Sequence, residues 1–187
     1  MKLLDGTKAY IHGVIDNYSR KILSWTVADH MDIESTCTVL LEAAKFLEPK
    51  DDKTPTLYCD SGVENINHKV DELIFSGLFT RILAQVDVTL SNSMIEAYWR
   101  SLRHQWLYLN NLSDMATVRR LVRFYVHQHN EVMPHAAFKG QTPDEMYSGK
   151  GQGVLIDLAK ARELARAARL KANRDLDCGK CPVKGKK

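Results

Sequence analysis

The order in which strand-type and helix-type patterns alternate along the chain constrains its fold most. Residues 8–16 and 22–27 are β-type runs separated by the turn-like segment 17–20, so they predict an antiparallel hairpin. Asp32 can cap a following helix whose apolar residues recur at helical spacing until Pro49. These patterns place a two-stranded hairpin and a helix at the start of the fold.

The next residues repeat the alternation of strand and helix. A short buried strand is predicted at 56–59, and a helix then opens at Asn67 or His68 and stops at Gly77. Residues 79–84 read as another strand, and a helix follows from Ser93 to about Leu109. Strands and helices that alternate in this way after a hairpin predict an α/β fold with a mixed sheet flanked by helices.

The carboxyl-terminal third is predicted to be largely helical. Asp114 caps a helix to about His129, residues 141–147 form a loop and short terminal turn, and an Ala/Arg-rich helix spans 155–174. A chain of 187 residues supports one domain plus a tail. We therefore divide it into a core at 1–150 and a basic helical extension with its tail at 151–187.

The first residues indicate that the chain starts inside a secondary-structure element. Leu4-Asp5-Gly6-Thr7 carries an Asp-Gly turn signal, which implies that Lys2-Leu3-Leu4 is the end of an earlier strand. We therefore expect a core that is truncated at its amino terminus, with most of its first central strand missing. Loss of that strand is expected to leave unpaired backbone edges and to weaken the fold.

Composition favours a globular protein. The chain is 44% hydrophobic and 26% charged and has no apolar run of 18 residues, so no membrane span is expected. Residues 1–5 do not resemble a signal peptide, and a cytoplasmic location follows by default. Cys37 and Cys59 fall in predicted core elements and are expected to be buried thiols, whereas Cys178 and Cys181 form half of a zinc knuckle or part of a mobile basic tail.

Positive charge is concentrated at one end of the chain. The net charge is +3, but residues 159–187 contain ten Lys or Arg against three acids, which leaves a net negative charge on residues 1–158. A basic terminal segment suits contact with nucleic-acid phosphates. Its alternative interpretation is a solvated, poorly ordered tail.

Asp60 and Glu96, with 35 residues between them, are the candidate catalytic and metal-binding residues. Asp60 directly follows the apolar run Leu57-Tyr58-Cys59, and ligands bind at the carboxyl ends of strands in open α/β sheets. Glu96 lies on one helix stripe with Asn92, Arg100 and Arg103, beside an apolar stripe of Ile95, Trp99, Leu102 and Trp106. One face of this helix can pack while the other can bind a ligand.

Each acid also has an ordinary structural explanation. Glu96 and Arg100 can form an i,i+4 ion pair, which contributes only a few tenths of a kcal/mol on a solvated face. Asp60 can be a turn residue of Asp60-Ser61-Gly62, with its side chain bonded to the backbone. Neither acid alone would identify a site.

The motifs around the two acids are more specific than the acids themselves. Ile15-Asp16-Asn17-Tyr18-Ser19-Arg20-Lys21-Ile22, Asp60-Ser61-Gly62, Asn92-Ser93-Met94-Ile95-Glu96, and Pro134-His135 with Thr142-Pro143 occur in the order seen in integrase core domains. Over residues 1–150 the chain resembles the DDE-type transposases of insertion sequences and the retroviral integrases. Arg103 also matches, since that family places a Lys or Arg seven residues after its Glu, whereas Ser61 stands where the family more often has Asn.

This resemblance implies a ribonuclease-H-like fold and a function in DNA transposition, that is, DNA integration and recombination by a mobile element. It also implies two-metal phosphodiester cleavage and strand transfer with Mg²⁺ or Mn²⁺ held by Asp60 and Glu96. Asn92, Arg100, Arg103 and His104 would be the DNA-binding residues, with the arginines and perhaps the histidine holding the phosphate backbone. The implied partners are transposon-end and target DNA, bound by a homo-oligomer without any membrane.

The third acid of the family's triad is expected upstream of Met1. Asp5 and Asp16 match the turn and the strand end that follow it, and they are poor substitutes because metal ligands must converge on one point. With Asp60 and Glu96 alone, the chain is expected to bind metal weakly and to show little or no strand transfer. An inactive DNA-binding or dimerising remnant, and a nuclease of the same fold that cuts without joining, are the alternative functions.

Overall fold

The computed structural model describes residues 1–47, 54–84 and 93–175. Within them, the predicted hairpin is confirmed: β1 (Tyr10–Ile15) pairs antiparallel with β2 (Ile22–Ala28), with Tyr10 opposite Ala28 and a bulge between Val14 and Ile15. The buried Asn130 side chain fixes the second strand, since it accepts from the Ile22 amide and donates to the Ile22 carbonyl, both at 2.9 Å. The hairpin is thereby tied to the carboxyl-terminal helices.

Residues 1–3 lie along the start of the hairpin. Gly6 takes the positive φ of +88° that the Asp-Gly turn requires, and Lys2 bridges Lys8 in antiparallel fashion. The Ala9 amide donates to the Met1 carbonyl, and the Met1 amino group donates to the Ala9 carbonyl, both at 2.8 Å. The expected end of an extended segment at residues 2–4 is thus seen as a single bridge.

The second strand pair is parallel and is joined by a helix. β3 (Thr56–Cys59) runs parallel to β4 (Thr80–Leu83) through α2 (His68–Phe75), which Asn67 caps by accepting the Val70 amide at 3.0 Å. These three elements lie where the sequence predicts them. A right-handed strand–helix–strand connection is the usual way to join parallel strands.

α1 (Ile33–Ala44) connects the two strand pairs. Asp32 caps it as predicted, with its side chain accepting from the Ser35 amide. The helix ends at Ala44, before the predicted stop at Pro49, which lies outside the described residues. Its buried residues Thr36, Val39, Leu40 and Ala43 face the strands.

The helix that carries Glu96 is shorter than predicted. α3 (Ser93–Gln105) ends one residue before Trp106, and the 3₁₀ turn η1 (Leu107–Leu109) replaces its expected last turn. The indole Nε1 of Trp106 donates to the Leu121 carbonyl at 3.0 Å, on α4 (Met115–His127). This side-chain bond to the next helix accompanies the break. Asp114 caps α4 as predicted.

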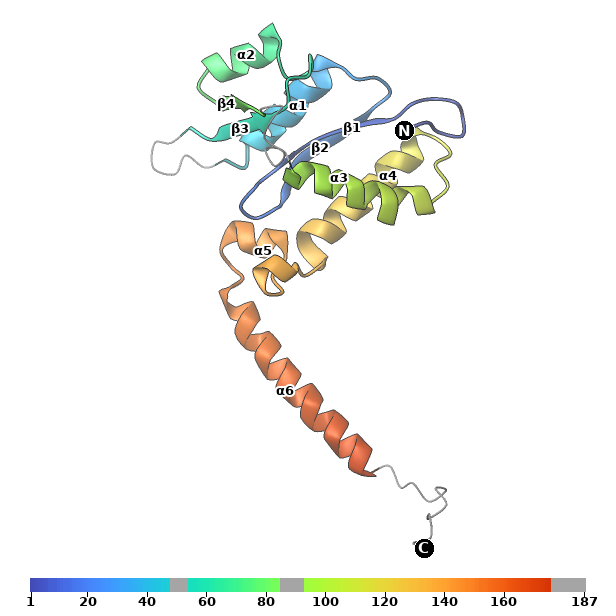
Figure 1. The fold of residues 1–187 in the computed structure, drawn as a ribbon, viewed down its shortest axis with the longest axis vertical. Helices are drawn as coiled ribbons and strands as arrows, with labels where there is room; N and C mark the ends of the chain where they lie inside the picture. The colour runs from blue at the N-terminus through green and yellow to red at the C-terminus, as the bar shows by residue number, and fades with distance from the viewer. Residues whose placement is uncertain (48–53, 85–92, 176–187) are drawn as a thin grey trace, which may run out of the picture.

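The remaining elements complete the carboxyl-terminal end. A π-helical segment, η2 (Gln128–Val132), follows α4, and η3 (Ala136–Phe138) leads to α5 (Pro143–Ser148). The sequence predicted only a turn there, but Thr142 and Glu145 form a capping box that starts a six-residue helix. α6 (Gln152–Asp175) has no buried residue and runs away from the other elements (Figure 1).

Two clusters of buried apolar residues hold these elements together. The larger lies between the hairpin, α3 and α4, and comprises Leu3, Ala9, Ile22, Val27, Tyr98, Leu102, Leu107, Val118, Val122, Tyr125 and Val126. The smaller lies between α1, α2 and the parallel strands, and comprises Leu40, Val70 and Phe79. The hairpin therefore has α3 and α4 on one side and α1 on the other (Figure 1).

The predicted α/β class is confirmed, but the predicted single mixed sheet is not formed by the described residues. β1 pairs with β2, β3 pairs with β4, and these are two separate two-stranded sheets. No described strand lies between β1 and β3, so their inner edges have no ladder to join them. Of the predicted buried thiols, Cys59 is buried and Cys37 is half-buried.

Among the described residues, no helix is both long enough and apolar enough to cross a membrane.

Candidate functional site

Asp60 lies directly after β3, where the sequence predicted it, and its side chain is exposed. Its Oδ1 accepts from the Asn65 side-chain amide at 2.6 Å and from the Gly62 amide at 3.2 Å. The predicted turn bond is therefore present. Both bonds use one oxygen, and within the described residues no hydrogen bond reaches Oδ2.

Glu96 lies in the first turn of α3 and is exposed. Tyr98 and Leu102 of the same helix are buried in the larger core, and Ile95 and Trp99 pack against it, so the apolar stripe orients the helix. The alternative ion pair with Arg100 is not formed. Among the described residues no hydrogen bond or ion pair involves the Glu96 carboxylate, so this group is open to a ligand.

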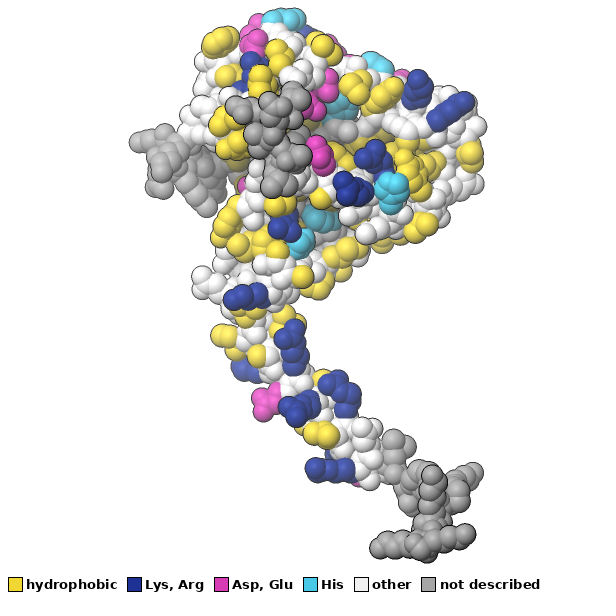
Figure 2. All heavy atoms as spheres, in the orientation of Figure 1, with side chains coloured by type: hydrophobic (Ala, Val, Ile, Leu, Met, Phe, Trp, Pro, Cys, Tyr) yellow, Lys and Arg dark blue, Asp and Glu magenta, His cyan; other side chains and the backbone are white. Residues whose placement is uncertain are grey.

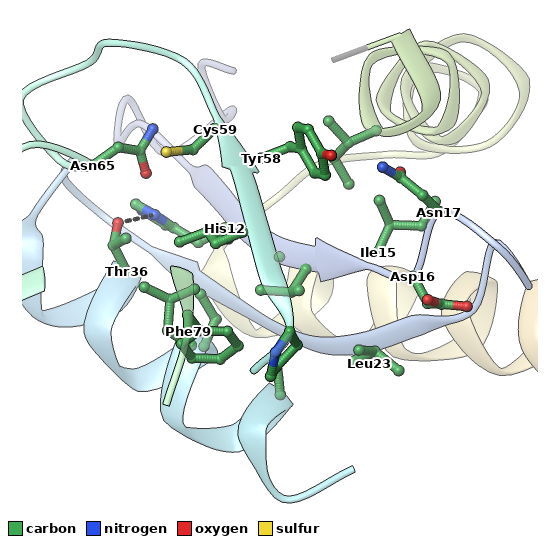
Figure 3. Close-up of a pocket in the computed structure, with 18 of the residues that line it drawn as sticks. His12, Ile15, Asp16, Asn17, Leu23, Thr36, Tyr58, Cys59, Asn65 and Phe79 are labelled. Atoms are coloured by element: carbon green, nitrogen blue, oxygen red, sulfur yellow. Dashed lines mark hydrogen bonds between the residues drawn. The ribbon is translucent and has the colours of Figure 1, made fainter. Parts of the chain in front are cut away.

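A cavity of about 350 Å³ lies between the hairpin and β3. Asp60 lines it from β3, and Ile95 and Trp99 line it from α3, so the residue next to Glu96 reaches the cavity although Glu96 itself does not line it. Figure 3 shows His12, Ile15 and Asp16 on the hairpin side and Tyr58 and Cys59 on the β3 side of this space. The structure thus brings β3 and the start of α3 to one cavity.

The described residues contain no group of three or more His, Cys, Asp or Glu side chains close enough to hold a metal ion. The two predicted ligands nevertheless suit a hard cation, because each offers a carboxylate oxygen that no protein donor occupies. The donor type therefore fits magnesium, although two carboxylates supply few of its six ligands. The metal assignment of Asp60 and Glu96 remains a prediction.

The other predicted DNA-binding residues follow Glu96 along α3. Arg100, Arg103 and His104 are all exposed, and the Arg103 guanidinium donates to the Trp99 carbonyl at 3.2 Å. Basic and histidine side chains are visible over this part of the surface in Figure 2. Asn92 lies outside the described residues. The exposed stripe of α3 is therefore positively charged on the carboxyl-terminal side of Glu96.

Asp5 and Asp16, the rejected substitutes for the third acid, both cap turns. The Asp5 Oδ1 accepts from the Thr7 amide and hydroxyl, and the Asp16 Oδ2 accepts from the Ser19 amide and hydroxyl. Asp16 also lines the cavity. These bonds give both residues structural roles in the turns that the sequence indicated.

The sequence interpretation missed three cavity residues. His12 faces α1, and its Nδ1 lies 3.3 Å from the Thr36 hydroxyl (Figure 3). Its Nε2 is buried and has no hydrogen-bond partner in the described part of the chain. Burial lowers the pKa of His12, although the Asp32 and Glu64 carboxylates act in the opposite direction. Glu64 and Asn65 also line the cavity, and their only sequence signal is their place in the turn after Asp60.

Insertion-element proteins resemble this chain in sequence. It is 22% identical over 142 residues to the putative transposase InsK of insertion sequence element IS150 from Escherichia coli, covering 76% of this chain and 50% of that protein. It is 25% identical over 150 residues to an uncharacterised protein of insertion element IS136 from Agrobacterium fabrum, covering 73% of this chain and 72% of that protein. The chain thus spans about half the length of InsK.

Viral integrases resemble it in fold. The simian T-cell lymphotropic virus intasome, solved in complex with a PP2A regulatory subunit, matches with a TM-score of 0.64 and 15% identity, covering 79% of this chain and 50% of that one. The HTLV-2 integrase catalytic core, solved in complex with magnesium, matches with a TM-score of 0.57 and 15% identity, covering 78% and 88%. The BIV integrase core matches with a TM-score of 0.59 and 14% identity, covering 80% and 90%. The two strand pairs therefore belong to a ribonuclease-H-like integrase core fold.

The match to a family is direct and covers the hairpin, α1, β3, α2, β4 and the start of α3. Residues 1–95, just over half of the chain, match the integrase core domain. Their similarity to transposases of insertion elements and their fold agree with that match. This chain therefore belongs to the integrase core domain (rve) family.

Proposed function

We propose that this chain is the catalytic core of a DNA transposase, in which Asp60 and Glu96 hold divalent metal for phosphodiester cleavage and strand transfer. The observation that carries the proposal is that Asp60 and the first turn of α3 approach the same cavity, with both carboxylates open to a ligand. Membership of the integrase core family supports it.

Asp60 and Glu96 would each contribute a hard oxygen ligand to bound magnesium. When bound, the metal ions would stabilise the attacking and leaving oxygens of an in-line displacement. The Asn65 amide holds Oδ1 of Asp60 at 2.6 Å and so leaves its second oxygen for the metal. Packing of Tyr98 and Leu102 fixes the helix from which Glu96 projects. The two acids would thus be held by different strands and helices.

Arg100, Arg103 and His104 would position DNA beside these acids. All three are exposed and lie within two turns of Glu96 on α3. Contacts of this kind bind the phosphate backbone and fix the register of the duplex without reading its sequence. Asn92 would join them from the start of the same helix. A homo-oligomer is proposed to hold the transposon ends and the target DNA together.

The decisive test uses the full-length product of the gene and a labelled duplex carrying the ends of the element that encodes it. Asp60→Asn and Glu96→Gln are each expected to reduce strand transfer by at least ~10²-fold, because misplaced metal removes most of the catalysis. Glu72→Gln, which alters another exposed carboxylate outside the cavity, is the matched control and should keep normal activity. Full joining activity in Glu96→Gln would refute the proposal, and cleavage without joining in the unaltered protein would favour a nuclease.

A second candidate function is that of an inactive DNA-binding or dimerising remnant. Exposed Arg162, Arg166 and Arg169 recur at helical spacing on α6, which buries none of its residues. Such a stripe suits sequence-independent phosphate contact. This function predicts DNA binding without any metal-dependent chemistry.

Charge removal separates this binding function from catalysis. Arg166→Gln with Arg169→Gln is expected to weaken binding to a random-sequence duplex and to reduce the salt slope by about 2. The matched control is Arg120→Gln with Arg123→Gln, which removes the same charge from exposed positions on α4. Equal effects of the two double variants would show that α6 has no special part in DNA binding.

A further inference from the structure

The cavity between β1 and β3 runs along two strand edges. All residues from 11 to 17 and from 55 to 60 line it. A sheet face would contribute only alternate residues of a strand, because successive side chains point to opposite sides. Consecutive lining residues are therefore the mark of an edge, and here two edges face each other across one space (Figure 3).

The backbone groups of both edges point into this space. The Ala9 amide and carbonyl both bond to Met1, so by alternation those of Ile11 and Gly13 point to the same side, away from β2. The carbonyls of Pro55 and Cys59 accept from the β4 side, at Thr80 and Ala84. By the same alternation, the amides and carbonyls of residues 56 and 58 point away from β4, toward the cavity.

The cavity is apolar on both of its broad sides. Val39, Leu40 and Ala43 of α1 form one side, and Ile95 and Trp99 of α3 contribute to the other. Strands that are covered by helices on both faces are apolar on both faces. His12 adds one polar point on the α1 side, because its buried Nε2 has no partner within the described residues.

The geometry points to a binding site for an extended peptide strand of a separate polypeptide, which inserts between β1 and β3. It would run antiparallel to β1, in line with residues 1–3, whose Lys2 bridges Lys8 in that sense. Its side chains would be apolar on both faces, with one hydrogen-bonding side chain, such as threonine, toward His12. Main-chain hydrogen bonds to both edges would supply affinity, and the two apolar sides would supply selectivity.

The probe is the synthetic peptide Lys-Val-Ile-Thr-Val-Ile-Lys with blocked ends, and the control is the same peptide with alternate amides N-methylated. Binding to the unaltered chain is followed by tryptophan fluorescence, which reports Trp99, and by hydrogen exchange. The unmodified peptide should slow exchange in residues 11–15 and 56–58. N-methylation should weaken binding by at least about tenfold, because it removes the donors that pair with the strands.

Three results would overturn this inference. Equal binding of the two peptides would exclude strand pairing, and peptide-induced protection confined to residues 80–83 would place the peptide on the outer edge of β4. Slow exchange of residues 11–15 and 56–58 in the free chain would show that the space is already filled. If that protection depends on chain concentration in light scattering, a second copy of this chain is the occupant.

Discussion

The larger and smaller cores divide the described residues into two unequal halves. The hairpin half, made of β1, β2, α3 and α4, has eleven buried apolar residues in its cluster, whereas the parallel half, made of α1, α2, β3 and β4, has three. Glu96 belongs to the first half and Asp60 to the second. The proposed metal ligands are therefore held by parts of the molecule with very different amounts of packing.

This difference indicates where the site gains and loses its geometry. Burial of apolar area is the main source of stability, so the smaller cluster is expected to open first. Large apolar side chains on the parallel half, such as Phe75 and Val63, are 88% and 79% exposed. The position of Asp60 then depends on weak packing, whereas that of Glu96 depends on a well-buried helix.

The largest expected effect comes from the hairpin half. Leu102→Ala removes a side chain that is fully buried on α3, and we expect it to lower the free energy of unfolding by about 2–5 kcal/mol. Urea denaturation monitored by tryptophan fluorescence measures this loss. Leu109→Ala, at a position that is 76% exposed, is the control and should change it by less than about 0.5 kcal/mol. Equal losses in both variants would contradict the assignment of the larger core.

A smaller and more local effect is expected in the parallel half. Val70→Ala empties part of the smaller cluster and should cost about 1.5–2.5 kcal/mol. Native-state hydrogen exchange should show faster opening of α2, β3 and β4, with little change in α3 and α4. If all six elements open together in this variant, the two halves form one cooperative unit and the comparison fails.

Acid should weaken the hairpin half through His129. Burial lowers the pKa of His129 below its usual value, despite the opposing bond from its Nε2 to the Arg20 carbonyl at 2.8 Å. The unfolded chain then binds a proton more readily, so this stabilisation is complete above about pH 6.5 and is lost as pH falls toward the lowered folded pKa. His129→Gln should reduce the fall in stability between pH 7 and 5, measured by urea denaturation. An unchanged pH profile would contradict the role of burial.

The smallest expected effect is on a surface ion pair of the parallel half. Lys69 on α2 donates to Glu34 on α1 at 3.0 Å, and both side chains are substantially exposed. Glu34→Gln should lower the free energy of unfolding by at most about 1 kcal/mol, and less at 0.5 M salt than at low salt. Thermal unfolding at the two salt concentrations measures it. A larger loss that is insensitive to salt would show that α1 and α2 are joined by more than packing and this pair.

Local patterns were predicted well because each depends on a few neighbouring residues. The hairpin, the strand at 56–59 and the caps at Asp32, Asn67 and Asp114 all appear as the sequence indicates. The break of α3 at Trp106 was not predictable, because it accompanies a bond to α4. Helical spacing alone extended the helix past that residue.

The site was only partly predictable for a similar reason. The position of Asp60 after a strand and of Glu96 on an exposed helical stripe followed from local pattern. The split of the sheet and the burial of His12 beside Thr36 depend on how distant elements pack, and neither has a local signal. The metal-binding roles of the two acids came from family resemblance and remain to be tested.

The most direct test of the central proposal is a double-mutant cycle for Mn²⁺ binding, measured by electron paramagnetic resonance on this chain. If Asp60 and Glu96 share one site, Asp60→Asn and Glu96→Gln should each weaken binding by at least ~10-fold, and the double variant should bind no more weakly than the weaker single variant. Glu72→Gln should bind as the unaltered chain does. Normal affinity in either single variant, or losses that simply add in the double variant, would contradict a shared site.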